Sequence, residues 1–581
     1  MKLLCVLCVL CGSSLFAAAL EREAFTIAKY DLQITLEPEQ QRLGARGKIT
    51  LRNDSGQPQK IAVLQISSSL NWRSIRVDGK AVQYVSQPYT SDIDHTGALS
   101  EAIVTLPAEI KPKDSVELEI GYEGVIPLDT TRLTRIGVPE DIAKHSSWDQ
   151  IGRSFTAVRG AGYVAWYPIT TESADFSEGN SLFEVVDRWK KREQDASMKL
   201  SLSSNAGIED AKPILLCSGS GYSIDTRGGG PHSHGAVCEY ERLGSVTPAL
   251  AMADYNENQS KPPLYLFSFA GHEDGAATYS NALEPAMKFV SGWFGQPTAP
   301  IAIVDLADPN SAPFESGTLL MASMAAEDSK LAGINLVHEL VHSALPSPRP
   351  WVYEGLAHFA EAMYRQEQGG RQAALDLLGL HRAAFLDSEK EVAAALQKSV
   401  GQKIVEPKNL GQPLAGTFDE TYYRSKAAYV WWMLRDMIGD DALKQAIGKY
   451  RAEDNTDRDP KYVERLIEAA AQRDLAWFFD DWVYRDRGLP DLRVQSVHPW
   501  KTEKGAQMFT VTLENLGNAG AEVPLTAVFN GGEITKRIEV HANSTATTRV
   551  EVPGTASEIV VNDGSIPEID LTNNVFKISA P

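Results

Sequence analysis

Two histidines and a glutamate lie in the stretch His338-Glu339-Leu340-Val341-His342, which has the pattern H-E-x-x-H. The apolar residues around it predict a helix, and residues four apart on a helix share one face. His338 and His342 can therefore present both imidazoles to one metal ion, with Glu339 placed to hold and deprotonate a metal-bound water. Zinc suits this set because it takes imidazole and carboxylate ligands and leaves one position open. The alternative, a chance match on a surface helix, fits poorly with apolar neighbours on several sides.

A third ligand is needed, and three candidates follow the motif: Glu354, His358 and Glu361. Prolines between residues 346 and 350 end the first helix, and a second helix is expected to begin near Trp351. The three candidates are spaced i, i+4 and i+7, so they share one face of that helix. A helix–turn–helix can bring any of them over the histidines, and the spacing alone leaves the choice open.

The two stretches H-E-L-V-H and W-V-Y-E-G-L-A-H-F-A-E together resemble the gluzincin zinc aminopeptidases, the family of aminopeptidase N. That family has H-E-x-x-H, a spacer of 18 residues, and a glutamate in a W-L-N-E-G-F-A-like stretch. The resemblance implies that Glu354 is the third ligand and that Glu361 orients a ligating histidine from behind. The spacer here is 11 residues, so counting alone would select Glu361. The local motif favours Glu354, because loops tolerate deletions more readily than helices do.

The segment from residue 421 to 439 resembles the family segment whose tyrosine donates a hydrogen bond to the oxyanion. Strict alignment places Arg424 at the tyrosine position. A one-residue bulge would bring Tyr423 there instead, and the resemblance then implies that Tyr423 assists the oxyanion. Tyr422 is the alternative, and two core tyrosines at a helix start would produce the same pattern without any catalytic role.

The motif F-E-S-G at residues 314–317 resembles the family strand whose glutamate binds the free amino group of the substrate. Glu315 lies 23 residues before His338 and precedes a predicted strand. The resemblance implies that Glu315 binds the substrate amine. A carboxylate at the entry to a strand, with no role in binding, is the competing interpretation.

The elements that must position these residues predict a multidomain α+β protein. Residues 20–262 contain alternating strands and predict an N-terminal antiparallel β-domain. Residues 263–490 begin with strands and continue with helices, the layout of a thermolysin-like, mainly α zinc peptidase domain. Residues 491–581 contain short strands with a hairpin signal at Asn530-Gly531-Gly532 and predict an immunoglobulin-like β-sandwich.

Several local expectations complete this outline. Residues 161–167 are predicted to form a strand, and residues 218–234 a glycine-rich loop. A helix is expected over residues 282–294, with Pro285 in its first turn and a cap near Asn281. Ser329 is expected to cap the zinc helix. A further helix is expected from about Arg371 to Asp387.

Residues 1–19 predict a secretory signal peptide. Lys2 precedes an apolar run, and three alanines at 17–19 offer a cleavage site. A lipid anchor at Cys11 is the alternative, but the residue before it is not small. No other stretch has 18 consecutive apolar residues, so the mature chain is not expected to span a membrane. We therefore expect an exported protein, periplasmic or extracellular.

Two cysteines, Cys217 and Cys238, remain after the predicted signal peptide. In an exported chain such a pair predicts a disulfide, although two unrelated buried thiols are possible. Closing this loop would stabilise the fold by roughly 3 kcal/mol.

The composition describes a soluble globular chain of 581 residues, 43% hydrophobic and 23% charged, with a net charge of −20. Such a charge argues against nucleic acids and anionic membranes as partners.

The sequence therefore predicts an exported zinc-dependent metallopeptidase that holds one Zn²⁺ per chain and hydrolyses peptides, in the first place as an aminopeptidase. Glu339 would activate the zinc-bound water. A zinc endopeptidase of the same fold is one alternative. A non-catalytic zinc-containing module that binds peptides or a protein is another, but such a module has no chemical need for Glu339. Side-chain specificity, natural substrate and oligomeric state are not encoded in these motifs.

Overall fold

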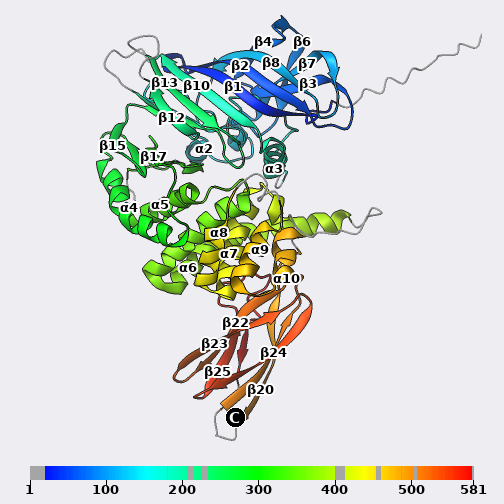
Figure 1. Ribbon diagram of the computed structural model, residues 1–581, viewed down its shortest axis with the longest axis vertical. Helices are drawn as coiled ribbons and strands as arrows, with labels where there is room; N and C mark the ends of the chain where they lie inside the picture. The colour runs from blue at the N-terminus through cyan, green and yellow to red at the C-terminus, as the bar shows by residue number, and fades with distance from the viewer. Residues whose placement is uncertain are drawn as a thin grey trace, which may run out of the picture.

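The computed structural model extends along one axis, with strands at one end, helices in the middle and strands at the other end (Figure 1). It describes residues 20–178, 181–205, 213–225, 233–325, 328–399, 413–452, 459–485, 487–501 and 507–578. The predicted signal peptide, residues 1–19, lies outside the described residues, so it stays a prediction. The mixed, multidomain organisation is confirmed. None of the helices in the described ranges combines the length and apolar character that a membrane span requires.

An eight-stranded sheet dominates the N-terminal part, in the order β12-β13-β10-β1-β2-β8-β4-β5. Its central strand β1 alternates buried Tyr30, Leu32 and Ile34 with more exposed residues, because successive side chains point to opposite faces of a sheet. A three-stranded sheet, β3-β7-β6, packs on the same core. The described pairs of both sheets are antiparallel, as predicted, except that β1 and β10 run parallel. The strands are β1 (Phe25–Glu37), β2 (Arg42–Asn53), β3 (Gln59–Ser67), β4 (Leu70–Val77), β5 (Lys80–Ala81), β6 (Gln83–Thr90), β7 (Ala98–Ile110), β8 (Ser115–Val125), β10 (Ser197–Asn205), β12 (Ser220–Asp225) and β13 (Ser233–Tyr240).

A second layer of the N-terminal part faces the helices. It contains the small sheet β11-β14-β9 and helix α3, which lies beside the helical part (Figure 1). The predicted strand at 161–167 is wrong: this apolar segment is buried but irregular, and the Ala165 carbonyl accepts a hydrogen bond from Ser67 N at 2.7 Å. The remaining elements of the N-terminal part are η1 (Pro38–Gln40), which joins β1 to β2, and α1 (Thr131–Thr134), α2 (Glu140–Ser146), β9 (Phe155–Val158), α3 (Ser181–Glu193), β11 (Ile214–Cys217) and β14 (Leu250–Ala253).

The predicted disulfide is confirmed, since Cys217 and Cys238 are bonded with their Cα atoms 6.4 Å apart. The bond joins the end of β11 to β13. The segment 218–234 between them was expected to be a loop, but β12 and the start of β13 lie within it. Ser220, Gly221 and Ser223 therefore lie in the edge strand β12, where a sheet tolerates them, and residues 226–232 lie outside the described residues.

A five-stranded sheet, β15-β16-β17-β19-β18, opens the middle part. It begins at Asn256, a few residues before the predicted change at 263. Strands β16, β17 and β19 are parallel, and the short edge strand β18 is antiparallel to β19. The strands are β15 (Asn256–Lys261), β16 (Leu264–Ser268), β17 (Ile301–Asp305), β18 (Phe314–Ser316) and β19 (Leu319–Ala322).

The helices that follow include two whose starts differ from the expectation. Helix α4 begins at Glu273, not near Asn281, so Pro285 lies inside it; two acidic residues in its first turn provide the terminal signal. Helix α5 is capped by Asp328 rather than Ser329, because the Asp328 carboxylate accepts from Lys330 N at 2.6 Å. The elements are α4 (Glu273–Trp293), α5 (Ser329–Ala344), α6 (Pro350–Ser399), η2 (Leu414–Gly416), η3 (Thr421–Lys426), α7 (Ala427–Ile438), α8 (Asp440–Lys449), α9 (Tyr462–Ala471), α10 (Ala476–Phe479) and η4 (Asp480–Tyr484).

Helix α6 starts next to Trp351, as predicted, and is interrupted at Gly370, whose φ is +79°. Such a φ favours glycine. The second segment therefore begins at Arg371, where a helix was expected. Near the start of α6, Gly355 allows close packing, since a Cβ there would lie 2.6 Å from the Ala427 Cβ on α7. This contact explains the glycine of the E-G-x-A motif.

The C-terminal part consists of two sheets, β20-β21-β24 and β23-β22-β25-β26. The predicted hairpin is present, since Phe529 pairs with Gly532 across a two-residue turn. One hydrophobic core runs from the helices into these sheets, from Leu264 to Ile566. The strands are β20 (Leu492–Lys501), β21 (Gln507–Asn515), β22 (Ala521–Phe529), β23 (Gly532–Val540), β24 (Ser544–Val552), β25 (Ala556–Val561) and β26 (Val575–Lys577).

Candidate metal centre

Helices α5 and α6 bring three nitrogen and oxygen donors to one point. The Nε2 atoms of His338 and His342 are 2.8 Å apart, and Glu354 Oε2 lies 3.6 Å and 3.7 Å from them. Neighbouring ligands of a tetrahedral zinc ion are about 3.3 Å apart, given bond lengths of about 2.0–2.1 Å. The three side chains therefore have the types and separations that a zinc site needs, with only small shifts.

Glu361 lies on the far side of His338. Its Oε1 is 2.7 Å from His338 Nδ1, whereas Glu354 faces Nε2. A carboxylate on Nδ1 fixes the imidazole so that Nε2 points to the shared centre. The same carboxylate contacts His358 Nδ1 at 3.1 Å. The two glutamates thus lie on one face of α6 about two turns apart, Glu354 toward the centre and Glu361 behind His338.

Two further residues, Glu315 and His358, have potential metal-ligand atoms close to this centre. Glu315, His338, Glu354 and His358 all have a ligand atom within 4.8 Å of the others, and the same holds for His358, Glu361 and His381. Glu315 Oε2 lies 3.1 Å from His338 Nε2. The sequence predicts Glu315 only as the residue that binds the substrate amine, and its closeness to His338 adds a carboxylate to the centre.

Glu339 is fully buried, and within the described part of the chain neither of its carboxylate oxygens has a hydrogen-bond partner. His342 Nδ1 and His358 Nε2 are also buried without a partner there. A buried carboxylate left in this state is costly. Glu354 Oε2, which faces both histidine Nε2 atoms, is also buried without a hydrogen-bond partner in the described chain. This oxygen and the Glu339 carboxylate therefore indicate groups that the protein chain itself does not supply, and a metal ion with water fits them.

The charges of the centre favour a cation. Burial opposes protonation of His338, but Glu315, Glu354 and Glu361 outweigh it and raise the pKa of this imidazole well above its ordinary value. Burial would raise the pKa of Glu354, yet His342, His338 and Arg424 hold it well below its usual range. Burial raises the pKa of Glu339 well above that of an exposed glutamate, against the pull of His338. The carboxylates thus attract positive charge to the His338 nitrogen, where a metal ion would bind.

The element η3 is a π-helix, in which hydrogen bonds span five residues instead of four. A π-turn inserts one extra residue into a helix, which is the bulge that the alignment required. Tyr423 lines the cavity beside Glu354, whereas Tyr422 packs edge-on to Phe385 with 6.2 Å between the ring centroids. Arg424 also reaches the cavity, and its Nη1 lies 2.6 Å from Glu315 Oε1.

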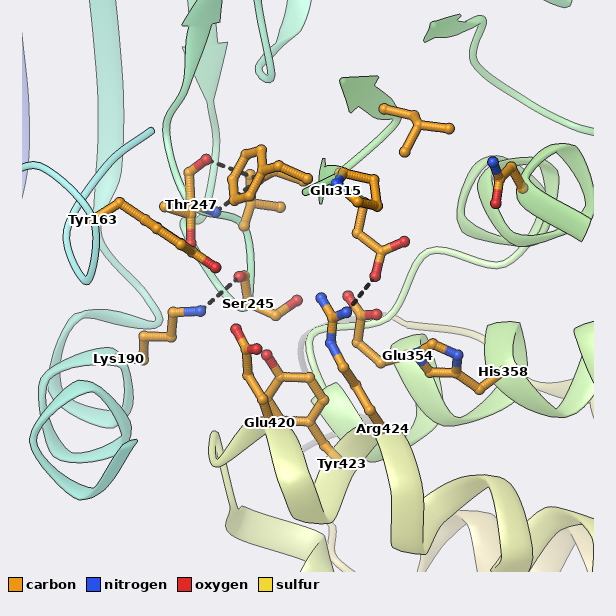
Figure 2. A pocket seen from close by; sticks show the side chains of 17 residues that line it. Tyr163, Lys190, Ser245, Thr247, Glu315, Glu354, His358, Glu420, Tyr423 and Arg424 are labelled. Atoms are coloured by element: carbon orange, nitrogen blue, oxygen red, sulfur yellow. Dashed lines mark hydrogen bonds and ion pairs between the residues drawn. The ribbon is translucent and has the colours of Figure 1, made fainter. Parts of the chain in front are cut away.

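The cavity beside the metal donors has a volume of about 230 Å³ and opens between the N-terminal and helical parts. Figure 2 shows Glu354 and His358 on one side, and Tyr163, Lys190 and Ser245 on the other. Lys190, on α3, and Glu420 were missed by the sequence analysis. A lysine in the basic last turn of an amphipathic helix has no distinguishing signal, so only the packing of α3 against the cavity identifies it.

Solved structures with a similar fold were found. Aminopeptidase A of Legionella pneumophila, in complex with aspartic acid, matches 94% of this chain and 59% of its own length, with 12% identity and a TM-score of 0.56. An M1 zinc metallopeptidase of Deinococcus radiodurans matches 81% of this chain and 96% of its own, with 16% identity and a TM-score of 0.47. No protein-family model and no curated protein sequence matches the chain.

The predicted resemblance to the zinc aminopeptidases is confirmed at the level of the fold, which this chain shares with the Legionella enzyme. The chain spans about three fifths of that enzyme's length. At 12% identity the likeness concerns the fold, and the chemistry must be argued from the side chains described above.

Proposed function

We propose that this protein is an exported zinc-dependent metallopeptidase that removes residues from the free N-termini of peptides. The observation that carries the proposal is Glu339: a fully buried carboxylate without a hydrogen-bond partner in the described chain, directly beside two histidines and Glu354. A structural glutamate would have acquired a partner. A general base for water attack needs to be held close to the metal ligands and free to take a proton.

His338, His342 and Glu354 would hold one zinc ion per chain, with Glu361 orienting His338. When bound, zinc supplies Lewis acidity and makes water a better nucleophile near neutral pH. Glu339 would take the proton of the attacking water and pass it to the leaving amine. Tyr423, whose pKa burial raises well above its ordinary value, stays protonated and would donate to the carbonyl oxygen as it gains charge.

Cleavage at the first peptide bond requires a carboxylate for the substrate ammonium. Glu315 is the predicted anchor, and it lines the same cavity as Glu354. Because Arg424 contacts the Glu315 carboxylate at 2.6 Å, the substrate amine would have to share Glu315 with this guanidinium.

The proposal includes three domains after the signal peptide at 1–19: a β-domain at 20–262, a thermolysin-like peptidase domain at 263–490 and an immunoglobulin-like sandwich at 491–581. The two C-terminal sheets, which enclose buried residues between them, support the last assignment. The bonded cysteines are compatible with export.

The test combines metal analysis with peptide cleavage. Purified protein is expected to contain one zinc per chain and to shorten unmodified peptides from the N-terminus, and chelation should stop the reaction. Each peptide is compared with its N-acetylated form, which lacks the ammonium charge, and the acetylated form should remain almost intact. Equal cleavage of both forms would identify an endopeptidase. Zinc without cleavage of any peptide would identify a non-catalytic binding module.

A further inference from the structure

The cavity wall opposite the metal donors carries a buried lysine. Lys190 is only 5% exposed, and its ammonium donates to the backbone carbonyl of Ser245 at 3.3 Å (Figure 2). Among the described residues no carboxylate forms an ion pair with it. A buried ammonium normally has a carboxylate partner, because desolvation of an uncompensated charge is costly.

A second buried cation lies beyond it. Lys190 also lines an adjoining cavity of about 170 Å³, together with Arg132. Arg132 is 4% exposed and donates to the carbonyls of Asp92 and Gly162 at 3.0 Å and 2.7 Å. Its Nε atom is buried without a partner in the described chain, and no described carboxylate forms an ion pair with its guanidinium. Both buried cations therefore lack an ion-pair partner among the described residues. Lys190 donates to one carbonyl, and Arg132 donates to two carbonyls and also lies over the rings of Tyr163 and Phe176, 5.9 Å and 5.5 Å from their centroids.

The other charges of the cavity are arranged differently. Arg424 is paired with Glu315, and Glu354 faces the histidines. Glu420 lines both cavities, and its charge favours the charged form of Lys190, although no ion pair joins the two among the described contacts. The cavity thus offers carboxylates for an ammonium, in Glu315 and Glu420, and separate cations for a carboxylate. A molecule with an ammonium and a nearby carboxylate would satisfy both kinds of charge, whereas a second positive charge would meet Lys190.

We infer that this cavity selects peptides whose first residue is aspartate or glutamate, with Lys190 binding the side-chain carboxylate. The inference rests on the proposed function, since it places the first residue of a substrate between the metal donors and α3. The ammonium of that residue would then lie toward Glu315 and Glu420, and its carbonyl toward Glu354 and Tyr423. The acidic side chain would reach into the wall that Lys190 forms.

The experiment compares four substrates that differ in one side chain: glutamyl, glutaminyl, aspartyl and asparaginyl peptides of otherwise identical sequence. In the zinc-loaded full chain, kcat/KM should be about 10- to 100-fold higher for each acid than for its amide, the range expected for one hydrogen bond to a charged group. Lys190→Gln should reduce this ratio to near one, mainly through the acidic substrates, and Lys190→Glu should bring it below one, because two carboxylates would then face each other.

Lys191→Gln is the matched control. Lys191 follows on the same helix turn, pairs with Asp187 at 2.7 Å and does not line the cavity, so its loss should leave the ratio unchanged. Far-ultraviolet circular dichroism and the unfolding midpoint show whether each variant folds.

A binding measurement separates this inference from the proposed reaction. Calorimetric titration of the zinc-loaded protein with free L-glutamate and with L-glutamine requires no turnover. Tighter binding of glutamate, lost in Lys190→Gln, supports the inference even if no peptide is cleaved. Equal binding of both amino acids, or a preference for glutamate that survives in a folded Lys190→Gln variant, overturns it.

Discussion

The helix pair α5–α6 and the π-helix η3 both face the same cavity, but they carry their residues there in different ways. In α5 the four-residue period places His338 and His342 on one face. In α6 Glu354 and Glu361 share one face two turns apart, so they reach opposite nitrogens of the His338 ring. In η3 the extra residue changes the period, so that Tyr423 faces the cavity and Tyr422 the core. In a regular helix the direction of each side chain can be predicted from the sequence spacing. Where a residue is inserted, the direction depends on the position of the insertion.

The regular helices and the π-helix also differ in the proposed roles of their residues, which are metal binding and oxyanion stabilisation. Residues that hold an ion must converge within about 4 Å, and a rigid helix pair achieves this. A residue that donates only while charge develops needs one correct direction, and π-turns often occur where function requires an irregular helix.

The largest effect is expected at the base. Glu339→Gln keeps the shape of the side chain but removes its ability to take a proton, so hydrolysis should be abolished while the zinc content and the unfolding midpoint remain close to those of the parent. Turnover and metal content are measured on the same preparation. Residual activity near the parent level would contradict the proposed mechanism.

The next effect distinguishes the two glutamates of α6. Glu354→Ala should lose most of the metal, because it removes a ligand. Glu361→Ala should weaken zinc binding by about 10- to 100-fold, as expected for loss of the partner of His338 Nδ1. Competition with a chelator of known affinity gives both values. If the order were reversed, Glu361 would be the ligand and the 18-residue count of the family would hold.

Within η3 the two neighbouring tyrosines form a matched pair. Tyr423→Phe should lower kcat by roughly 100-fold, the usual effect of losing one oxyanion donor, with little change in KM. Tyr422→Phe removes a hydroxyl that does not line the cavity, so kcat should stay near the parent value. Steady-state kinetics on one substrate compares them directly. A large loss in Tyr422→Phe alone would show that the insertion acts one residue earlier.

The smallest effect is expected at the start of α5. Asp328→Ala removes the carboxylate that accepts from Lys330 N, so the free energy of unfolding should fall by about 1 kcal/mol. Urea denaturation followed by fluorescence measures it. Zinc content and turnover should not change, because the histidines lie in buried turns that packing holds in place. A loss of zinc in this variant would show that the cap, and not the core, positions the ligands.

The sequence was sufficient for the helix pair because its motifs lie within unbroken helices. His338, His342, Glu354 and Glu361 occupy the faces that periodicity predicts. Strands with a long alternation of apolar and polar residues, such as β1 and β8, could be predicted equally well. Prediction failed at residues 161–167, where apolar residues are buried without pairing, and at α4, where an acidic first turn outweighed the signal of Pro285.

Local sequence patterns did not predict the residues on the side of the cavity opposite the metal donors. Lys190 and Glu420 come from elements more than 200 residues apart, and each follows an ordinary local pattern. Their roles depend on how α3 packs against the helical part, and that packing is tertiary structure, which local sequence patterns do not specify. The Arg424–Glu315 pair is of the same kind, since it joins a π-helix to an edge strand.

The hydrophobic core that continues from Leu264 to Ile566 has a consequence for the chain as a whole. Trp482 is fully buried and donates to the carbonyl of Gly520 at 2.8 Å, and Arg473 pairs with Glu522 and Glu539 across the same boundary. The helical part and the C-terminal sheets should therefore melt as one cooperative unit. Such a unit can close only after synthesis has passed Ile566, the last residue of that core.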